Sequence, residues 1–197
     1  MDLADLALDP FDQFERWYGD VVAARLPEPS AMVLTTADAR GRSLGRHVLL
    51  KGVDQHGFVW FTNYESAKGR HLSENPWACL VFPWFSINRQ VVVTGAVSLL
   101  APAESDAYFA SRDRSSQLSA WASVQSRPIP DRAWLEERLA DFDRRFAGVE
   151  VTRPPHWGGY RLTPHMLEFW QSGPARLHDR FRYTPNPAGW EIERLSP

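Results

Sequence analysis

Basic residues near the end of the chain are the first candidates for chemistry. Arg176, His178 and Arg180 alternate there, after an aromatic stretch at residues 168–171 and a break at Gly173-Pro174. If the segment 175–183 is extended, side chains two residues apart share a face at intervals of about 6.6 Å. Such a row of cations suits a phosphate or carboxylate, but the same charges also occur on solvated edge strands. Taken alone, the segment favours the edge strand.

Two earlier pairs of polar residues are further candidates for anion binding. Arg46 and Lys51 bracket a strand-like hexapeptide, and because they are five positions apart they would face opposite sides of it. Each could meet a phosphate on a different ligand, although charges at strand ends are often solvated. Ser66 and Lys68 lie at a predicted helix start, where free backbone N–H groups and the helix dipole favour an anion.

A third group lies in the second half of the chain. Tyr108, Arg112 and Ser116 place a phenol, a guanidinium and a hydroxyl around a predicted helix end and the loop after it. Together they could bind a phosphate dianion, or they could be an ordinary exposed helix end. Two separable phosphate-type sites beside an aromatic strand suggest two phosphorylated ligands that meet.

Signatures of several common enzyme classes are absent. The chain contains no GxGxxG after a strand, no GxxxxGK[ST], no HExxH, no CxxC and no GxSxG. The six histidines are scattered, and none has a second ligand at metal-binding spacing. The sequence therefore does not favour a Rossmann dinucleotide-binding protein, a P-loop nucleotide-binding protein, a zinc protein or a serine hydrolase. We also expect no metal site.

Length and composition predict one domain, spanning residues 1–197, with a flexible stretch at residues 1–9. A chain of 197 residues that is 44% hydrophobic can bury one core but is short for two. The net charge of −2, with mixed signs along the chain, argues against nucleic acid. The single cysteine, Cys79, fits a reducing compartment. Without a signal peptide or a run long enough to cross a membrane, we expect a cytoplasmic protein.

Hydrophobic periodicity places these residues on a series of neighbouring strands that a few helices interrupt. One helix is expected from Asp9-Pro10 to a point before Pro27, and others at 67–74, 103–111, 115–122 and from about 131 to Gly148. Strands are expected at residues 31–36, 44–53, 58–62, 77–85, 90–100, 157–164, 166–171, 175–183 and 190–195. Short neighbouring strands without βαβ alternation predict an α+β fold, a closed antiparallel barrel with helices packed outside.

In this order, the motifs of the chain resemble those of the pyridoxine (pyridoxamine) 5′-phosphate oxidase family over about residues 11–197. Related phenazine-pathway flavin oxidases share residues 168–170 and 194–197, so that class remains an alternative, as does a non-catalytic module that binds FMN or pyridoxal phosphate. Lys51 and the run at residues 176–180, together with Tyr108, Arg112 and Ser116, favour the vitamin B6 enzyme. The motifs that carry the resemblance are 46–51, 61–63, 66–68, 82–84, 89–90, 125–126, 157–159, 168–171 and 176–180.

The resemblance implies a split-barrel homodimer with FMN at the subunit interface. It also implies oxidation of pyridoxine 5′-phosphate and pyridoxamine 5′-phosphate to pyridoxal 5′-phosphate, with O2 reduced to H2O2. Arg46, Ser66 and Lys68 would hold the FMN phosphate. The remaining expected flavin contacts are His47, Val48, Leu49, Leu50, Lys51, Phe61, Thr62, Gln90, Gln125, Ser126, Trp170 and Arg180.

The resemblance assigns the substrate to a second set of residues. Its phosphate would be bound by Lys51, Tyr108, Arg112 and Ser116, while Arg176 and His178 would lie over the pyridine ring as catalytic residues. Two positions depart from the family pattern: Phe61 stands where Tyr is frequent, and Ala67 where many members have a second Arg. The second departure implies weaker FMN binding. The family's basic N-terminal segment, which can cover the substrate, has no counterpart before Phe11.

Overall fold

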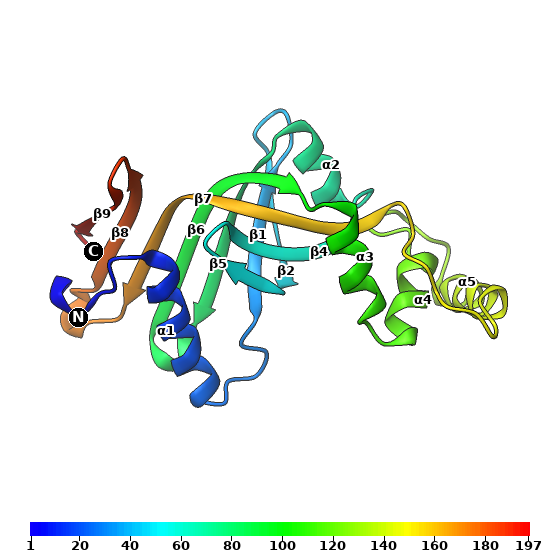
Figure 1. The fold of residues 1–197 in the computed structure, drawn as a ribbon, viewed down its shortest axis with the longest axis horizontal. Coiled ribbons are helices and arrows are strands. Elements are labelled where there is room, and N and C mark those ends of the chain that lie inside the picture. Colours follow the sequence, from blue (N-terminus) through cyan, green and yellow to red (C-terminus); the bar gives the residue numbers. More distant parts are fainter.

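One long strand, β7 (Trp157–Gln171), organises the sheet of the computed structural model, which describes residues 1–197 (Figure 1). Strand β6 (Arg89–Leu99) pairs with it along nearly its whole length. On its other edge, β4 (Gly57–Asn63) pairs with the first half of β7 and β8 (Asp179–Asn186) with the second half. The first half of β7 therefore belongs to the part of the sheet that contains β4, and the second half carries the C-terminal strand β8.

The other strands complete an antiparallel sheet of nine strands. Its order is β2-β1-β5-β6-β7-β4-β3, with β8 on β7 and β9 on β8. No strand pairing joins β2 to β3, so the curled sheet stays open there. The split-barrel fold class is confirmed, whereas the expectation of a closed barrel is wrong. The remaining bounds are β1 (Ala31–Ala37), β2 (Ser43–Leu49), β3 (Gly52–Asp54), β5 (Trp77–Trp84) and β9 (Gly189–Leu195).

The strand expected at 44–53 is two strands with different partners. Leu50 donates its backbone N–H to the Ser30 carbonyl, beside β1, and the next residue, Lys51, donates to Val59 of β4. The chain thus leaves one side of the opening and joins the other at this point. A local pattern cannot reveal such a change of partner, and the change places Lys51 at the opening.

The strands expected at 157–164 and 166–171 are one continuous strand. The pairing of β7 with β6 shifts by one residue between Thr94 and Gly95, so that His165 has no direct partner. This bulge accommodates Pro164, which lacks the N–H that a regular ladder needs.

Three helices begin after a side chain that caps them, at positions where the sequence predicts a helix start. Asp9 caps α1 (Pro10–Ala23), Ser66 caps α2 (Ala67–Glu74) and Asp131 caps α5 (Arg132–Arg145). The helix expected to close at Gly148 has Arg145 as its last residue, and Gly148 has a positive φ of +74°. Helices α3 (Pro102–Ala110) and α4 (Arg114–Ala122) lie with α5 at one end of the molecule (Figure 1). None of the helices is long and apolar enough to cross a membrane.

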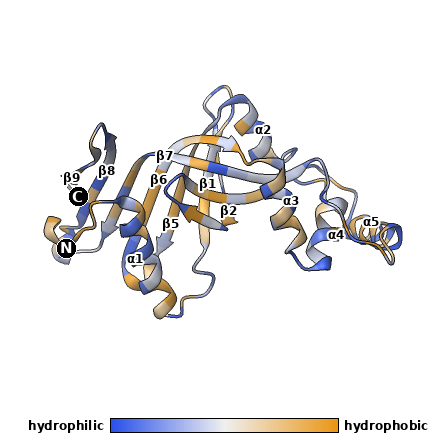
Figure 2. Cartoon of the chain, viewed as in Figure 1, coloured by the Kyte–Doolittle hydropathy of each residue, from blue (hydrophilic) through white to orange (hydrophobic).

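Two hydrophobic cores hold these elements. In the larger, Phe14 and Trp17 of α1 pack edge-on against Phe58, Phe82 and Phe169 of the sheet, and Figure 2 shows hydrophobic residues along these strands. The smaller core joins α3, α4 and the end of α5 to the start of β7, through Phe109, Leu118, Ala120, Phe146, Val151 and Trp157. This second core fixes the helices that face the opening of the sheet.

Residues 1–9 lie against the C-terminal hairpin. Leu6 and Ala7 are buried, and the Tyr183 hydroxyl donates to the Ala7 carbonyl at 2.9 Å. The flexibility expected for this stretch remains a prediction.

Candidate functional site

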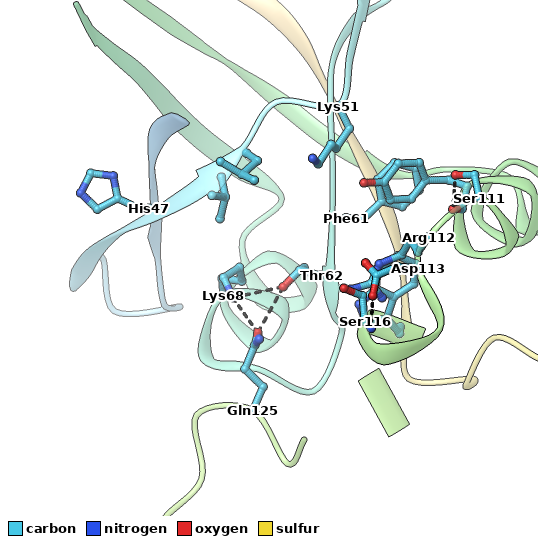
Figure 3. Close-up of a pocket in the computed structure, with 14 residues that line it drawn as sticks. His47, Lys51, Phe61, Thr62, Lys68, Ser111, Arg112, Asp113, Ser116 and Gln125 are labelled. Carbon is cyan, nitrogen blue, oxygen red and sulfur yellow. Dashed lines mark hydrogen bonds between the residues drawn. The ribbon is translucent and has the colours of Figure 1, made fainter. Parts of the chain in front are cut away.

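A cavity of about 640 Å3 lies between the opening of the sheet and helices α3 and α4 (Figure 3). Both of the chain's two lysines, Lys51 and Lys68, line it. Eleven of its lining residues are predicted site residues: His47, Val48, Leu49, Lys51, Phe61, Thr62, Lys68, Tyr108, Arg112, Ser116 and Gln125. The structure thus collects residues from five separate segments around one space.

Lys68 is held on one wall of the cavity by neutral partners. The Ser66 cap starts α2 and puts Lys68 in its first turn, where the side chain is buried. Its Nζ donates to Gln125 Oε1 at 2.8 Å and to Thr62 Oγ1 at 3.1 Å (Figure 3). It also donates to Ser66 Oγ at 3.4 Å. Burial, followed by the charge of Arg46, lowers the pKa of Lys68 to about 8. No carboxylate offsets this pair of cations.

Arg46 lies on β2 behind that wall and is oriented by β1. Its Nη1 donates to the Leu34 carbonyl at 2.9 Å and to Thr36 Oγ1 at 2.8 Å. Its Nη2 is buried and has no hydrogen-bond partner. Burial lowers the pKa of this guanidinium. Since a buried unpaired donor is costly, the arrangement suits an anion that binds beside Lys68.

A second cationic group occupies the wall formed by the α3–α4 turn. The Arg112 guanidinium lies over the Trp157 ring, 4.7 Å from its centroid, and its Nη1 is buried without a partner. Tyr108, Ser116 and Lys51 line the same cavity. Burial lowers the pKa of Arg112. The phenol, hydroxyl and two cations form the donor set expected of a phosphate site.

Flat aromatic rings separate the strand side of the cavity from α3. The Phe61 and Tyr108 rings stack with centroids 3.8 Å apart at 14°, and Trp157 lies nearly parallel to both. The glycines after Trp157 permit this packing, since a Cβ at Gly159 would lie 2.8 Å from Phe61 Cε1. The stack fixes Tyr108 beside Arg112.

Three residues that line the cavity were not predicted from the sequence as site residues: Ser111, Asp113 and Trp157. Asp113 caps α4 by accepting from the Ser116 N–H at 2.8 Å, and hydrogen bonds from Ser115 and Ser116 hold its pKa well below its ordinary value. An aspartate just before a predicted helix is typical of such a cap, so this role could have been predicted from the sequence.

Several predicted site residues lie away from this cavity. Arg180 on β8 forms a two-pronged ion pair with Glu168, at 2.8 and 3.0 Å, which raises its pKa. Gln90 pairs with Trp170 across β6 and β7. Leu50, Ser66 and Ser126 do not line the cavity, although Ser66 contacts Lys68. Gln90, Trp170, Arg176, His178 and Arg180 gather instead around the second half of β7.

The expected row of Arg176, His178 and Arg180 on one strand face is wrong. The chain forms a turn of 3-10 helix at Pro174–Arg176, and β8 begins only at Asp179. Ala175 and Arg176 both have positive φ, +51° and +63°. The Leu177 N–H donates to Pro174 O and the His178 N–H to Arg176 O, so the chain stays coiled up to β8. Arg176 and His178 are therefore loop residues.

Two family models match this chain. The model described as pyridoxamine 5′-phosphate oxidase matches residues 19–143, and that described as the pyridoxine 5′-phosphate oxidase C-terminal dimerisation region matches residues 157–197. The pyridoxine/pyridoxamine 5′-phosphate oxidase of Acidothermus cellulolyticus is 59% identical, over 98% of this chain and 88% of its own. That of Synechocystis sp. is 52% identical, over 98% and 91%.

Solved structures agree with this family relationship. PhzG from Burkholderia lata 383, crystallised with tetrahydrophenazine-1-carboxylic acid, matches with a TM-score of 0.92 and 33% identity over 98% of this chain and 95% of that chain. A pyridoxamine 5′-phosphate oxidase-related, FMN binding protein from Nostoc punctiforme shares the fold, with a TM-score of 0.76 and 16% identity over 98% and 100%. With the family models and the relatives above 50% identity, these matches confirm the resemblance seen in the motifs. The chain is therefore an oxidase of the pyridoxine/pyridoxamine 5′-phosphate oxidase family.

Proposed function

We propose that this chain oxidises pyridoxine 5′-phosphate and pyridoxamine 5′-phosphate to pyridoxal 5′-phosphate, using FMN and reducing O2 to H2O2. With the amine substrate, water hydrolyses the oxidised imine and ammonia leaves. One observation carries the proposal: the three cations that line the cavity, and Arg46 behind its wall, have no anionic partners. Arg46, Lys51, Lys68 and Arg112 take part in none of the chain's ion pairs. Both arginines also keep one buried nitrogen unpaired. Two such groups on two walls suit two phosphates.

The group around Lys68 fits the phosphate of FMN. Lys68, the unpaired Nη2 of Arg46 and the Ser66 hydroxyl supply cationic and neutral donors beside the start of α2. A phosphate dianion there would relieve the repulsion between the two cations. Thr62 and Gln125, which hold Lys68, would also approach the flavin.

The group around Arg112 fits the phosphate of the substrate. Arg112, Lys51, Tyr108 and Ser116 would bind it and so fix the position of the pyridine ring by remote binding energy. When bound, FMN supplies the acceptor for the hydride that leaves C4′ and passes the electrons on to O2. Arg176 and His178 would orient the ring and stabilise charge that develops on it.

Arg176 and His178 would reach the cavity from the second chain of a homodimer. Residues 157–197 match a dimerisation region, and within one chain these two residues lie away from the cavity. In a two-fold dimer, each cavity would combine Arg112 of one chain with Arg176 of the other.

Mixing two inactive variants tests this shared site. Arg112→Met chains and Arg176→Ala chains, unfolded and refolded together, form mixed dimers that contain one intact site and one doubly altered site. We expect roughly a quarter of wild-type turnover after equal mixing, because half of the dimers are mixed. Each variant refolded alone is the control. No recovery of turnover, despite mixed dimers on native mass spectrometry, would show that each chain completes its own site.

Lys68 predicts a pH dependence for FMN binding. Its pKa of about 8 in the free protein means that it loses its proton as the pH rises above 8. A bound phosphate favours the protonated amine, so binding takes up a proton in this range and the Kd for FMN should rise by up to about tenfold per pH unit. Flavin fluorescence quenching measures the Kd. Riboflavin, which lacks the phosphate, and Lys68→Met should show no such trend; a flat Kd for FMN would contradict the assignment.

An aerobic assay tests the reaction itself. Purified protein reconstituted with FMN is given pyridoxine 5′-phosphate or pyridoxamine 5′-phosphate, and pyridoxal 5′-phosphate and H2O2 are measured. Product in catalytic excess over enzyme, with equimolar H2O2, is the expected result. Bound flavin without aldehyde from either substrate would overturn the proposal.

A phenazine-type oxidase is the second candidate, because the structure of PhzG superposes with a TM-score of 0.92. It predicts turnover of a reduced tricyclic carboxylic acid in place of the B6 phosphates. Such a substrate lacks a phosphate and would leave Arg112 unpaired. The same assay with a tetrahydrophenazine carboxylic acid distinguishes the two.

A further inference from the structure

We infer that Gly173 is a positioning residue that fixes the His178 ring as a hydrogen-bond donor through Nε2. The inference rests on the proposed function, in which His178 faces the substrate. It assigns a role to the loop that precedes β8, and it specifies which nitrogen of His178 carries the proton.

The hydrogen bond between these two residues has only one possible direction. The Gly173 backbone nitrogen lies 3.2 Å from His178 Nδ1. A backbone N–H can only donate, so Nδ1 must accept, and in a neutral imidazole the proton then resides on Nε2. The ring makes no other hydrogen bond within the chain. Its Nε2–H is therefore free to donate to a bound molecule.

A second contact fixes the plane of the ring. His178 packs against the Trp170 indole, with ring centroids 4.7 Å apart and an angle of 46° between the planes. The side chain is half-buried as a result. The amide of Gly173 and the face of Trp170 together restrict both rotation and flipping of the imidazole.

Only glycine fits at position 173. A Cβ there would lie 2.0 Å from the Leu177 carbonyl oxygen and 2.9 Å from its carbonyl carbon. Both atoms belong to the backbone, so rotation of a side chain cannot relieve the clash. A larger residue must move residue 173 away from residues 177 and 178, and the bond to Nδ1 would be lost.

The rest of the loop is held in a conformation that side chains disfavour. Ala175 and Arg176 are consecutive residues with φ of +51° and +63°, and neither is glycine. Hydrogen bonds from Leu177 to Pro174 and from His178 to Arg176 close the turn. Strained backbone of this kind persists where the surrounding structure enforces it, often beside functional groups. Here it carries the two residues expected over the substrate ring.

The tautomer decides what His178 can do. With its proton on Nε2, the ring can donate to an oxygen or nitrogen of the substrate and stabilise negative charge there. The same nitrogen has no lone pair with which to accept a proton. His178 would thus act as a donor rather than as a general base.

Nitrogen-15 NMR of the FMN-loaded protein tests the positioning directly. His178 is identified by the signals that disappear in His178→Gln. We expect the Nε2–H tautomer in the wild type and a mixture of tautomers in Gly173→Ala, with kcat at least tenfold lower and FMN affinity within about twofold. Gly19→Ala is the matched control, because a Cβ at Gly19 meets nothing within 4 Å. An Nδ1–H tautomer in the wild type, or unchanged His178 signals in Gly173→Ala, would overturn the inference.

Two substitutions of His178 test the donor role without altering the loop. A glutamine amide nitrogen can occupy the place of Nε2, whereas an asparagine amide reaches only the place of Nδ1. We expect His178→Gln to retain at least tenfold more kcat than His178→Asn; equal losses would refute donation from Nε2. The NMR result needs no turnover, so a wild type that fails to oxidise B6 phosphates defeats the proposed function and not the tautomer. Turnover with an Nδ1–H ring defeats only this inference.

Discussion

Replacing Arg112 with methionine should lower kcat/KM for pyridoxine 5′-phosphate by about 30- to 150-fold and leave FMN affinity unchanged. The guanidinium would donate to the substrate phosphate from the buried face of Trp157, and such charge-assisted hydrogen bonds contribute about 2–3 kcal/mol. Methionine keeps the long apolar stem against the Trp157 ring and removes the charge and its donors. Steady-state kinetics and flavin fluorescence separate the two effects.

The same substitution should not destabilise the protein. In the wild type, desolvation lowers the pKa of the half-buried Arg112 and its Nη1 has no partner, so holding the cation there costs free energy. An apolar side chain of similar length avoids the cost of desolvating an unpaired charge. We therefore expect an equal or higher melting temperature in the absence of ligand. Arg132→Met on α5 is the control, since Arg132 is exposed and pairs only with Glu136. A large fall in melting temperature for Arg112→Met would mean that Arg112 is structural.

The sequence identified the cations of the site but not their pairing. Lys51, Lys68 and Arg112 stand on separate segments, and the strand and helix patterns placed them near element ends. Whether a cation meets a carboxylate depends on tertiary contacts. Arg180 looked like one member of a free row, yet Glu168, across the β7–β8 pair, neutralises it. Lys68 and Arg112 have no carboxylate partner. This absence distinguishes the cations of a candidate anion site from cations that are neutralised within the fold.

The errors in the predicted strands also arise from tertiary contacts that a local pattern does not contain. Local periodicity located α1 and α2 because their caps and apolar faces are encoded within a few residues. The break at Leu50 depends instead on Ser30 and Val59, which are distant in sequence. Two strands were expected at 157–164 and 166–171, but pairing with β6 continues through a bulge between Thr94 and Gly95 and makes them one. In each case long-range pairing overrode a local signal.

The strand predicted over the residues just before β8 was the most consequential error, because those residues form a loop and Arg176 does not lie on a strand face. Two consecutive positive φ values are not readable from Ala175 and Arg176, neither of which favours that region. The expected row of cations assumed strand alternation. In the structure this segment is a strained turn. Arg176 is exposed there, and the His178 ring is held by the Gly173 amide and the Trp170 ring.

Arg176→Ala should therefore reduce turnover and spare both stability and FMN binding. The Arg176 guanidinium makes no ion pair, and alanine bears the same Cβ at the positive φ, so the turn gains no new strain. If the guanidinium stabilises charge that develops on the substrate ring, kcat and kcat/KM should fall together by about 100-fold or more. Single-turnover reduction of bound flavin by pyridoxine 5′-phosphate measures this step, and fluorescence quenching measures FMN affinity.

Arg182→Ala on the neighbouring strand is the matched control for that measurement. Arg182 pairs with Glu193 across β8 and β9 at 2.8 Å on the surface, and its loss should change neither flavin reduction nor affinity. If Arg176→Ala instead releases FMN while turnover per bound flavin stays normal, Arg176 belongs to the cofactor site. Since its neighbour His178 is held by Gly173 and Trp170 independently of the Arg176 side chain, the tautomer of His178 should survive the substitution. A lost tautomer together with lost turnover would show instead that the two residues act through one loop conformation.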